Sequence, residues 1–303
     1  MRTSYLGTSE FAATVLRRLA VSPHKPSLVV TPPDSRRGRG RRELPPPAAE
    51  LAAELGLPLL QSADVNEEAA LAKLRAAAPA AVVVCAFGQL IREPLLSEYP
   101  LLNVHPSLLP RWRGAAPIER AIMAGDAETG TCIMRLTAGL DSGPVALSER
   151  VEIGPEEDFA ALSERLAALS GELLVRALDL QEAGKLEFAE QDEAAVTYAE
   201  KIDPAERRID PSRPASAEAA RVRALTPHVG AYLELAGGER LGVKRARAVD
   251  GSGAPGTVAQ SPDRNLLIAC AERVLEVDVV QPPGGKPMPA DAYLRGHELP
   301  QLA

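Results

Sequence analysis

Leu101-Leu102-Asn103-Val104-His105-Pro106 is an apolar run that carries two polar side chains and stops at a proline. Successive side chains of a β-strand point to opposite faces, so Asn103 and His105 lie on the same face. Proline cannot continue a central strand, which predicts a short buried strand that ends here. In open α/β sheets ligands bind at strand ends, so an amide and an imidazole at this place indicate a functional site.

The sequence around this strand alternates between β-like and helical patterns. We expect strands at residues 2–6, 27–31, 59, 82–87 and 131–136, and helices at residues 9–20, 48–55, 67–77, 117–124 and 159–182. Alternating β and α units predict a Rossmann-like α/β domain with a parallel sheet and right-handed crossovers. The nearly continuous apolar run at 82–87 is typical of a central strand covered on both faces.

A second domain is expected after this unit. From residue 187 the periodicity fades while charges and prolines accumulate. A helix at 217–224 is followed by β-like runs at 231–235, 240–248, 266–271 and 274–280, separated by turn signals such as Gly237-Gly238 and Asp250-Gly251. Short strands with frequent turns predict a small, OB-like β-barrel. We therefore divide the chain into a catalytic domain (1–186), a linker (187–206) and a barrel domain (207–303).

Composition narrows the class of protein. Three dispersed cysteines, Cys85, Cys132 and Cys270, indicate a reducing compartment and no disulfide framework or zinc site. No apolar run approaches the roughly 18 residues that a membrane span needs. The first residues have no signal-peptide core. We expect a cytoplasmic protein with no membrane contact and no metal.

One segment is strongly basic although the net charge of the chain is -7. Five of the seven residues from 36 to 42 are arginine, namely Arg36, Arg37, Arg39, Arg41 and Arg42. We expect these residues to form a flexible loop after the strand at 27–31, and arginines on a loop that contains glycine suit contact with phosphate groups. A solvated run of charge is the alternative, and these residues alone leave both open.

Asp141, within Gly139-Leu140-Asp141-Ser142-Gly143, completes a chemically sensible set with Asn103 and His105. An amine that attacks a formyl carbon creates a tetrahedral oxyanion. N–H groups of Asn103 and His105 would stabilise that oxygen by roughly 3–4 kcal/mol per donor. Asp141 would orient the imidazole and make it a better proton donor. A structural histidine and a turn-capping aspartate remain the alternative.

Longer motifs resemble a known family. Asn103-Val104-His105-Pro106-Ser107-Leu108-Leu109-Pro110, then Arg113-Gly114-Ala115-Ala116-Pro117-Ile118 and Gly139–Gly143 are similar to the 10-formyltetrahydrofolate-dependent formyltransferases. The resemblance covers nearly the whole chain and extends through Thr197-Tyr198-Ala199-Glu200-Lys201-Ile202.

The resemblance implies a function and a set of site residues. The catalytic residues are Asn103, His105 and Asp141. The folate site is lined by Ser107, Leu108, Leu109 and Pro110, with Leu90, Ile91 and Gly139 shaping the pterin pocket. The implied donor is 10-formyltetrahydrofolate, and the implied acceptor is the α-amino group of methionine on initiator Met-tRNA. The arginine segment matches a tRNA-binding insertion. The barrel would contact the tRNA backbone, with Lys244, Arg245 and Arg247 as candidates, and a monomer is expected.

Three other functions fit parts of the pattern. A sugar-nucleotide N-formyltransferase would share the donor and the three catalytic residues but would lack the basic insertion. A hydrolase that releases formate from the same folate would need neither the insertion nor the barrel. A non-catalytic RNA-binding module would use the barrel alone. Two places depart from the family pattern, Tyr5 in an otherwise apolar strand and Thr226-Pro227-His228-Val229-Gly230.

Overall fold

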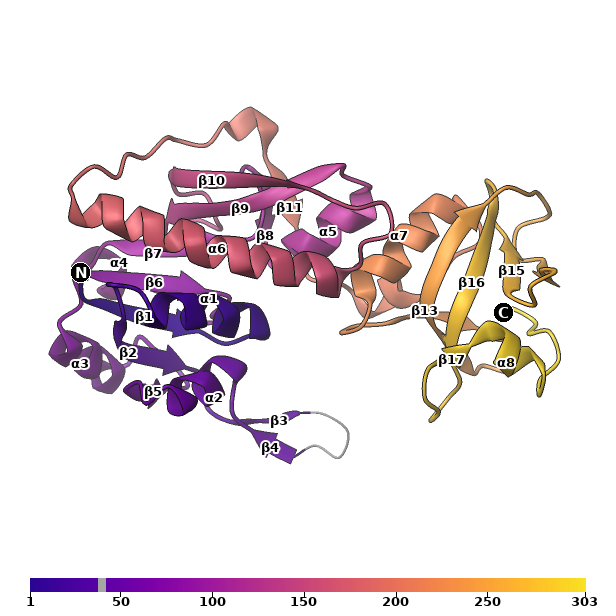
Figure 1. Ribbon diagram of the computed structural model, residues 1–303, viewed down its shortest axis with the longest axis horizontal. Helices are drawn as coiled ribbons and strands as arrows, with labels where there is room; N and C mark the ends of the chain where they lie inside the picture. Colours follow the sequence, from indigo (N-terminus) through magenta and orange to yellow (C-terminus); the bar gives the residue numbers. More distant parts are fainter. Residues whose placement is uncertain (38–41) are drawn as a thin grey trace. The chain divides into compact units, whose positions relative to one another are not determined.

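The computed structural model describes residues 1–37 and 42–303, and these form two compact units (Figure 1). Unit 1 consists of Met1–Gly114, Thr129–Val151 and Ser163–Tyr198, and unit 2 of Ala115–Glu128, Glu152–Leu162 and Ala199–Ala303. Residues 187–198, which the sequence analysis places in a linker, therefore pack within unit 1. No helix among the described residues is long and apolar enough to cross a membrane.

Among the described residues of unit 1, seven strands form one sheet in the order β10-β9-β7-β6-β1-β2-β5. Their bounds are β1 (Thr3–Gly7), β2 (Pro26–Thr31), β5 (Leu59–Gln61), β6 (Ala81–Cys85), β7 (Leu101–His105), β9 (Glu128–Arg135) and β10 (Val145–Glu152). The Rossmann-like parallel core, from β5 to β7, is confirmed.

The prediction of a parallel orientation is wrong for β9, which runs antiparallel to β7 with His105 opposite Cys132 and Leu102 opposite Arg135. The connection from β7 passes through α5 (Pro117–Ala124) and brings the chain back at the carboxyl end of β7. Because the next strand starts at that end, it can pair with β7 only by running the other way.

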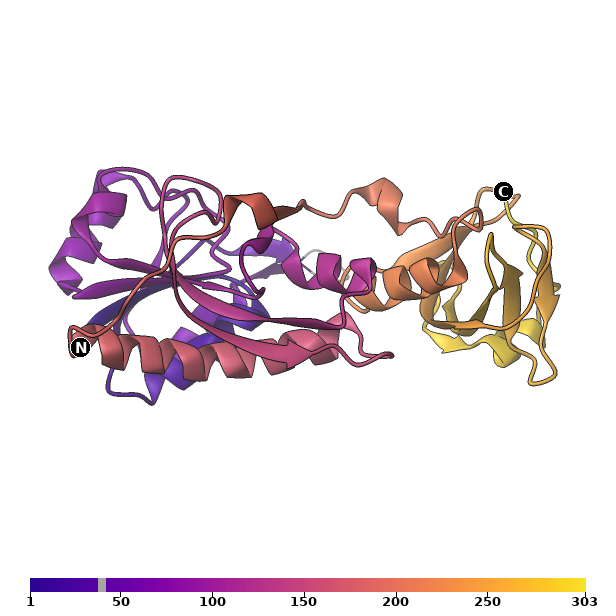
Figure 2. The ribbon, with the colours of Figure 1, turned by 90° about the horizontal axis from the view of Figure 1, so that it is seen from above.

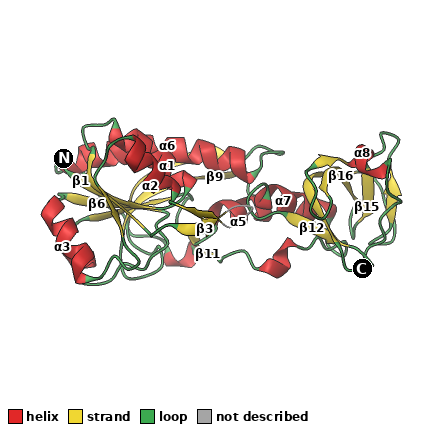
Figure 3. Ribbon diagram, turned by 90° about the horizontal axis from the view of Figure 1, so that it is seen from below, coloured by secondary structure: helices red, strands yellow, loops and turns green. Residues whose placement is uncertain are grey.

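Helices cover both faces of the sheet, as the two views turned from Figure 1 show (Figures 2 and 3). One face packs against α1 (Glu10–Ala20), α2 (Pro47–Glu54) and α6 (Phe159–Glu182), and Tyr5, Val83 and Val104 belong to that core. The other face packs against α3 (Glu68–Ala77) and α4 (Leu95–Glu98), and its core includes Val82, Val84 and Leu101. Apolar burial on both faces explains why β6 is a continuous apolar run.

Tyr5, which departs from the family pattern, is fully buried in β1 and donates its hydroxyl to the carbonyl of Ala12 at 2.7 Å. The ring occupies space that Gly7 leaves open, since a Cβ at Gly7 would lie 2.6 Å from the Tyr5 ring. A buried phenol with a hydrogen-bond partner is compatible with this core. Burial also raises the pKa of the neighbouring Cys85 thiol to about 12, which makes that thiol a small core side chain with no reactive thiolate.

A two-stranded ribbon lies where the sequence analysis places a flexible arginine loop. β3 (Ser35–Arg37) pairs antiparallel with β4 (Arg42–Leu44), with Arg36 opposite Glu43. The ends of this segment are therefore strands, which corrects the loop prediction. The cause is local, because the two strands satisfy each other's backbone groups.

In unit 2 the described strands form a six-stranded antiparallel sheet, β12-β13-β16-β15-β14 with β17 beside β16. The bounds are β12 (Ala231–Glu234), β13 (Arg240–Val249), β14 (Val258–Gln260), β15 (Leu266–Ala269), β16 (Val274–Gln281) and β17 (Met288–Pro289), with α7 (Ala215–Leu225) and α8 (Ala290–Leu294). The strands predicted after residue 230 are confirmed, and they pair antiparallel. Two 3-10 turns, Glu193–Ala195 and Pro204–Arg207, precede α7.

The second departure from the family pattern, residues 226–230, follows α7. His228 stacks on the Phe159 ring with 3.8 Å between ring centroids and contacts the Glu119 carboxylate at 2.9 Å. An aromatic stack and a polar contact thus join three segments of unit 2 that are distant in sequence. The departure changes how this segment packs, and it lies away from Asn103, His105 and Asp141.

We expect Gly7→Ala to lower the free energy of unfolding by about 1–3 kcal/mol, because the added methyl overpacks the core between Tyr5 and Ala12. Urea denaturation followed by circular dichroism measures this. Gly237→Ala is the control, since a Cβ there meets nothing within 4 Å. Equal stability of the two variants would contradict the packing described for Tyr5.

Candidate active site

Strand β7 places Asn103 and His105 on one face of the sheet, as their spacing predicts. Both side chains are buried, with 8% and 4% of their surface exposed. They lie on the face of Leu101, opposite the face on which Leu102 and Val104 pack. Because β7 is paired on both sides, by β6 and β9, its side chains have a rigid base.

The loop between β9 and β10 brings Asp141 to these two residues. Its carboxylate accepts a hydrogen bond from Asn103 Nδ2 at 3.3 Å and one from the backbone N–H of Gly114 at 2.9 Å. His105 Nδ1 lies 3.7 Å from Asp141 Oδ2. The structure therefore brings Asn103, His105 and Asp141 together.

The loop needs an unusual backbone to do this. Asp141 has a φ of 44°, in the left-handed region that non-glycine residues rarely adopt. At Gly143 a Cβ would lie 2.0 Å from the carbonyl oxygen of Arg135, so no side chain fits there. Left-handed conformations at non-glycine residues cost about 1–3 kcal/mol and persist only where surrounding contacts impose them.

The imidazole of His105 is oriented by a backbone group. Its Nε2 lies 2.8 Å from the carbonyl oxygen of Trp112, which is in β8 (Arg111–Gly114). A carbonyl only accepts, so Nε2 carries a hydrogen and donates it. Nδ1 is then the nitrogen that faces Asp141 and exchanges a proton.

These groups together can stabilise a developing oxyanion and move a proton. The Asn103 amide has two N–H groups, of which one is engaged by Asp141 and the other is available to a substrate oxygen. No group of three His, Cys, Asp or Glu side chains within 1–37 and 42–303 is placed to hold a metal ion. An amide donor, an imidazole and a carboxylate gathered at one place suit acyl transfer chemistry.

The predicted folate residues have different environments. Ser107 is buried, and its hydroxyl accepts the backbone N–H of Trp112 at 3.3 Å, so it shapes the turn after β7. Leu108 packs against Gly130 of β9, and Leu109 and Pro110 are half-buried. Ile91 belongs to the core. Leu90 is 69% exposed, and Leu140, next to Gly139, is 62% exposed.

Three contributors to the site were missed by the sequence analysis: the carbonyl of Trp112, the N–H of Gly114 and the side chain of Gln191. Gln191 Nε2 donates to the carbonyls of Asp141 at 2.8 Å and Gly143 at 2.7 Å. Gly114 belongs to a motif of the family resemblance and Trp112 does not, and a backbone carbonyl or N–H group carries no signal in the sequence. Gln191 lies in the segment assigned to a linker.

The structure places three of the five predicted arginines. Arg36 and Arg42 lie on β3 and β4 with exposed side chains, and Arg37 belongs to β3. Arg39 and Arg41 lie outside the described residues. Exposed cations on both strands of the ribbon are compatible with phosphate contact.

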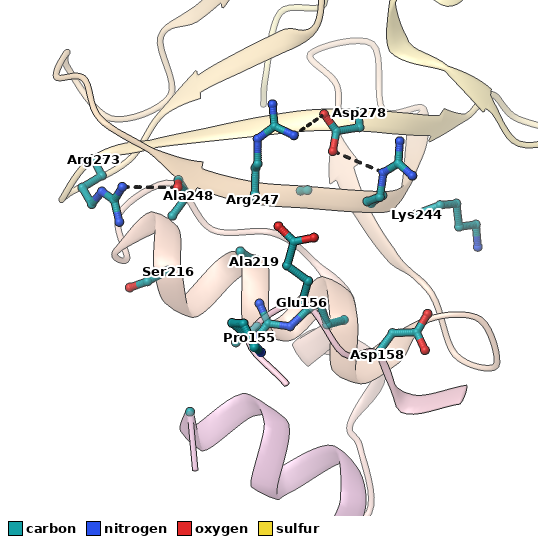
Figure 4. A pocket seen from close by; sticks show the side chains of 15 residues that line it. Pro155, Glu156, Asp158, Ser216, Ala219, Lys244, Arg247, Ala248, Arg273 and Asp278 are labelled. Carbon is teal, nitrogen blue, oxygen red and sulfur yellow. Dashed lines mark hydrogen bonds and ion pairs between the residues drawn. The ribbon is translucent and has the colours of Figure 1, made fainter. Parts of the chain in front are cut away.

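The candidates in the C-terminal sheet line a cavity of about 680 Å³ in unit 2 (Figure 4). Arg245 and Arg247 of β13 both pair with Asp278, at 3.3 and 3.6 Å. Arg247 also contacts Glu276 at 2.7 Å. Lys244 is a further lining residue. Since the two arginines are engaged by carboxylates, their charge is largely compensated within the protein.

The chain matches two family models and many curated proteins. Residues 1–178 match the model described as formyl transferase, and residues 201–298 match the formyl transferase C-terminal domain. A methionyl-tRNA formyltransferase of Parvibaculum lavamentivorans is 42% identical over 99% of this chain and 98% of that protein. One of Xanthomonas campestris pv. campestris is 44% identical over the full length of both.

Solved structures share the fold at low identity. HypX from Aquifex aeolicus in complex with tetrahydrofolic acid is 18% identical with a TM-score of 0.65, over 97% of this chain and 47% of HypX. This chain thus spans about half of HypX. An N-formyltransferase from Helicobacter canadensis with folinic acid and dTDP-3-aminofucose is 10% identical with a TM-score of 0.64, over 91% of this chain and 97% of that one.

The contact with the Trp112 carbonyl predicts the tautomer of the neutral His105 ring. In nitrogen NMR of the labelled protein, Nε2 should carry the hydrogen and Nδ1 should carry none. The signals are assigned by their loss in His105→Gln. A neutral ring protonated on Nδ1 would contradict the geometry.

Proposed function

The chain belongs to the formyl transferase family, and we propose that it transfers the formyl group of 10-formyltetrahydrofolate to the α-amino group of methionine on initiator Met-tRNA. The observation that carries the proposal is the cluster of Asn103, His105 and Asp141 at β7. The choice of acceptor is supported by the curated relatives, which align with this chain from end to end and are methionyl-tRNA formyltransferases.

The chemistry follows from the three side chains. The amine nitrogen forms a bond to the formyl carbon, and the formyl oxygen gains negative charge. The second N–H of Asn103 donates to that oxygen, a contact worth roughly 3–4 kcal/mol, and His105 lies beside it to exchange the proton that the reaction releases. Asp141 compensates the charge of the imidazole. As the carbon–N10 bond breaks, the attacking nitrogen loses a proton and N10 of the folate gains one, with His105 Nδ1 as the exchanging group.

The folate would lie against the loops that follow β6 and precede β10. Leu90 and Leu140 offer exposed apolar surface for a flat ring system. Gly139 permits close approach of the backbone, and Ile91 anchors the Leu90 loop in the core. Residues 107–110 border the site, where Ser107 acts by holding Trp112 in place.

The arginine ribbon, formed by β3 and β4, supports a tRNA acceptor over the sugar-nucleotide alternative. Arg36 and Arg42 are exposed cations on the paired strands β3 and β4, which suits phosphate contact. Structures of sugar N-formyltransferases resemble this chain at 10–17% identity, which speaks for the fold alone. The functional division is then catalysis in 1–186, a linking segment in 187–206 and tRNA contact by 207–303. We expect a cytoplasmic monomer.

The test of the proposal is formyl transfer to Met-tRNA by the wild-type protein and two variants. His105→Ala and Asp141→Asn should each lower kcat by about a hundredfold or more, because each removes charge stabilisation that exists only in the transition state. Circular dichroism checks that both variants fold. A folded Asp141→Asn protein with wild-type turnover would overturn the mechanism.

Arg42→Ala should raise KM for Met-tRNA several-fold while kcat stays near the wild-type value. A lost phosphate contact should also reduce the slope of log affinity against log salt concentration by about 0.9. Arg17→Ala is the matched control, since Arg17 on α1 is an exposed arginine that pairs with Glu54 on α2. If the two variants behave alike, the ribbon does not bind tRNA.

A further inference from the structure

Three consecutive residues of β8 hold the site from one side. The carbonyl of Trp112 accepts from His105 Nε2 at 2.8 Å, and the N–H of Gly114 donates to Asp141 Oδ2 at 2.9 Å. Arg113, between them, is buried and turns its side chain away to other partners. The backbone of this strand therefore contacts both His105 and Asp141, whereas the side chain of Arg113 contacts other residues.

That side chain holds Gln191. Arg113 Nε donates to Gln191 Oε1 at 2.9 Å, and Gln191 Nε2 donates to the carbonyls of Asp141 and Gly143. With its oxygen turned to an N–H donor and its nitrogen turned to two acceptors, the amide has only one orientation that satisfies all three contacts. One glutamine thus fixes two carbonyls of the loop that carries Asp141.

Arg113 is fixed in turn by Glu193. The guanidinium meets the carboxylate through Nη2–Oε1 at 2.7 Å and Nη1–Oε2 at 3.3 Å, a two-point contact that sets its orientation. The Glu193 hydrogen bond raises the pKa of Arg113, and the arginine lowers the pKa of the Glu193 carboxyl. The pair is therefore charged at neutral pH.

We propose that Gln191, held by Arg113 and Glu193, is a positioning residue that sets the Asp141 carboxylate for catalysis. Asp141 adopts a left-handed backbone, so outside contacts must impose its conformation. A shift of about 1 Å in a catalytic group costs about a hundredfold in rate, so the carboxylate, 3.7 Å from His105 Nδ1, must be held in place. Gln191 touches no reacting atom and acts through the loop. The proposal rests on the catalytic role of Asp141 proposed above.

The test compares Gln191→Ala, Arg113→Met and the double variant in formyl transfer to Met-tRNA. Methionine keeps the length of Arg113 without its donors. Each single variant should lower kcat about 10- to 100-fold and change KM for either substrate by less than about threefold. Because both substitutions act through one contact, the kcat of the double variant should be no lower than that of the less active single variant. Glu190→Ala, an exposed neighbour on the same segment, is the control and should keep the wild-type kcat.

Hydrogen exchange of the Gly114 amide gives a readout that needs no turnover. Release of the Asp141 carboxylate in Gln191→Ala should speed that exchange about tenfold or more, with other β7 and β8 amides unchanged. The proposal would be overturned if folded Gln191→Ala keeps the wild-type kcat or the wild-type exchange rate of the Gly114 amide. Additive losses of kcat in the double variant would also overturn it. If Gln191→Ala does not fold, Arg113→Met decides by the same criteria. If the wild-type protein transfers no formyl group but Gly114 exchange is faster in Gln191→Ala, the proposed function is wrong. The role of Gln191 in positioning Asp141 would then still hold.

Discussion

A carboxylate in a half-buried site must be surrounded by hydrogen-bond donors, and the Asp141 carboxylate imposes this requirement on its neighbourhood. Its donors come from two different elements, the amide of Asn103 on β7 and the N–H of Gly114 on β8. Both oxygens are used, and one of them also faces His105. The positions of β7, β8 and the loop before β10 are therefore tied to one another through a single side chain.

The site combines a rigid strand with a loop that must be held. β7 lies inside the sheet, paired on both sides and covered by helices, so Asn103 and His105 have little freedom. Asp141 sits on a loop with a left-handed backbone, and loops carry such residues only where contacts enforce them. The contacts come from the N–H of Gly114 and from the side chain of Gln191, which are far apart in sequence.

The sequence predicted what depends on local pattern. The pairing of Asn103 and His105 on one face follows from strand alternation, and α5 begins at Pro117 because proline is favoured at a first helical position. The antiparallel β9 and the role of Gln191 depend on where distant segments meet. A glutamine among charged residues carries no periodic signal, and a backbone carbonyl such as that of Trp112 is present at every residue. Only the tertiary structure shows which of these groups contact the site.

Formyl transfer from 10-formyltetrahydrofolate should be measured with three acceptors offered separately: initiator Met-tRNA, elongator Met-tRNA and an amino-sugar nucleotide. We expect transfer confined to initiator Met-tRNA, because the chain combines the Asn103, His105 and Asp141 cluster with exposed arginines on β3 and β4. Transfer to the amino-sugar nucleotide alone would keep the catalytic cluster and contradict the assignment of the ribbon and the C-terminal sheet.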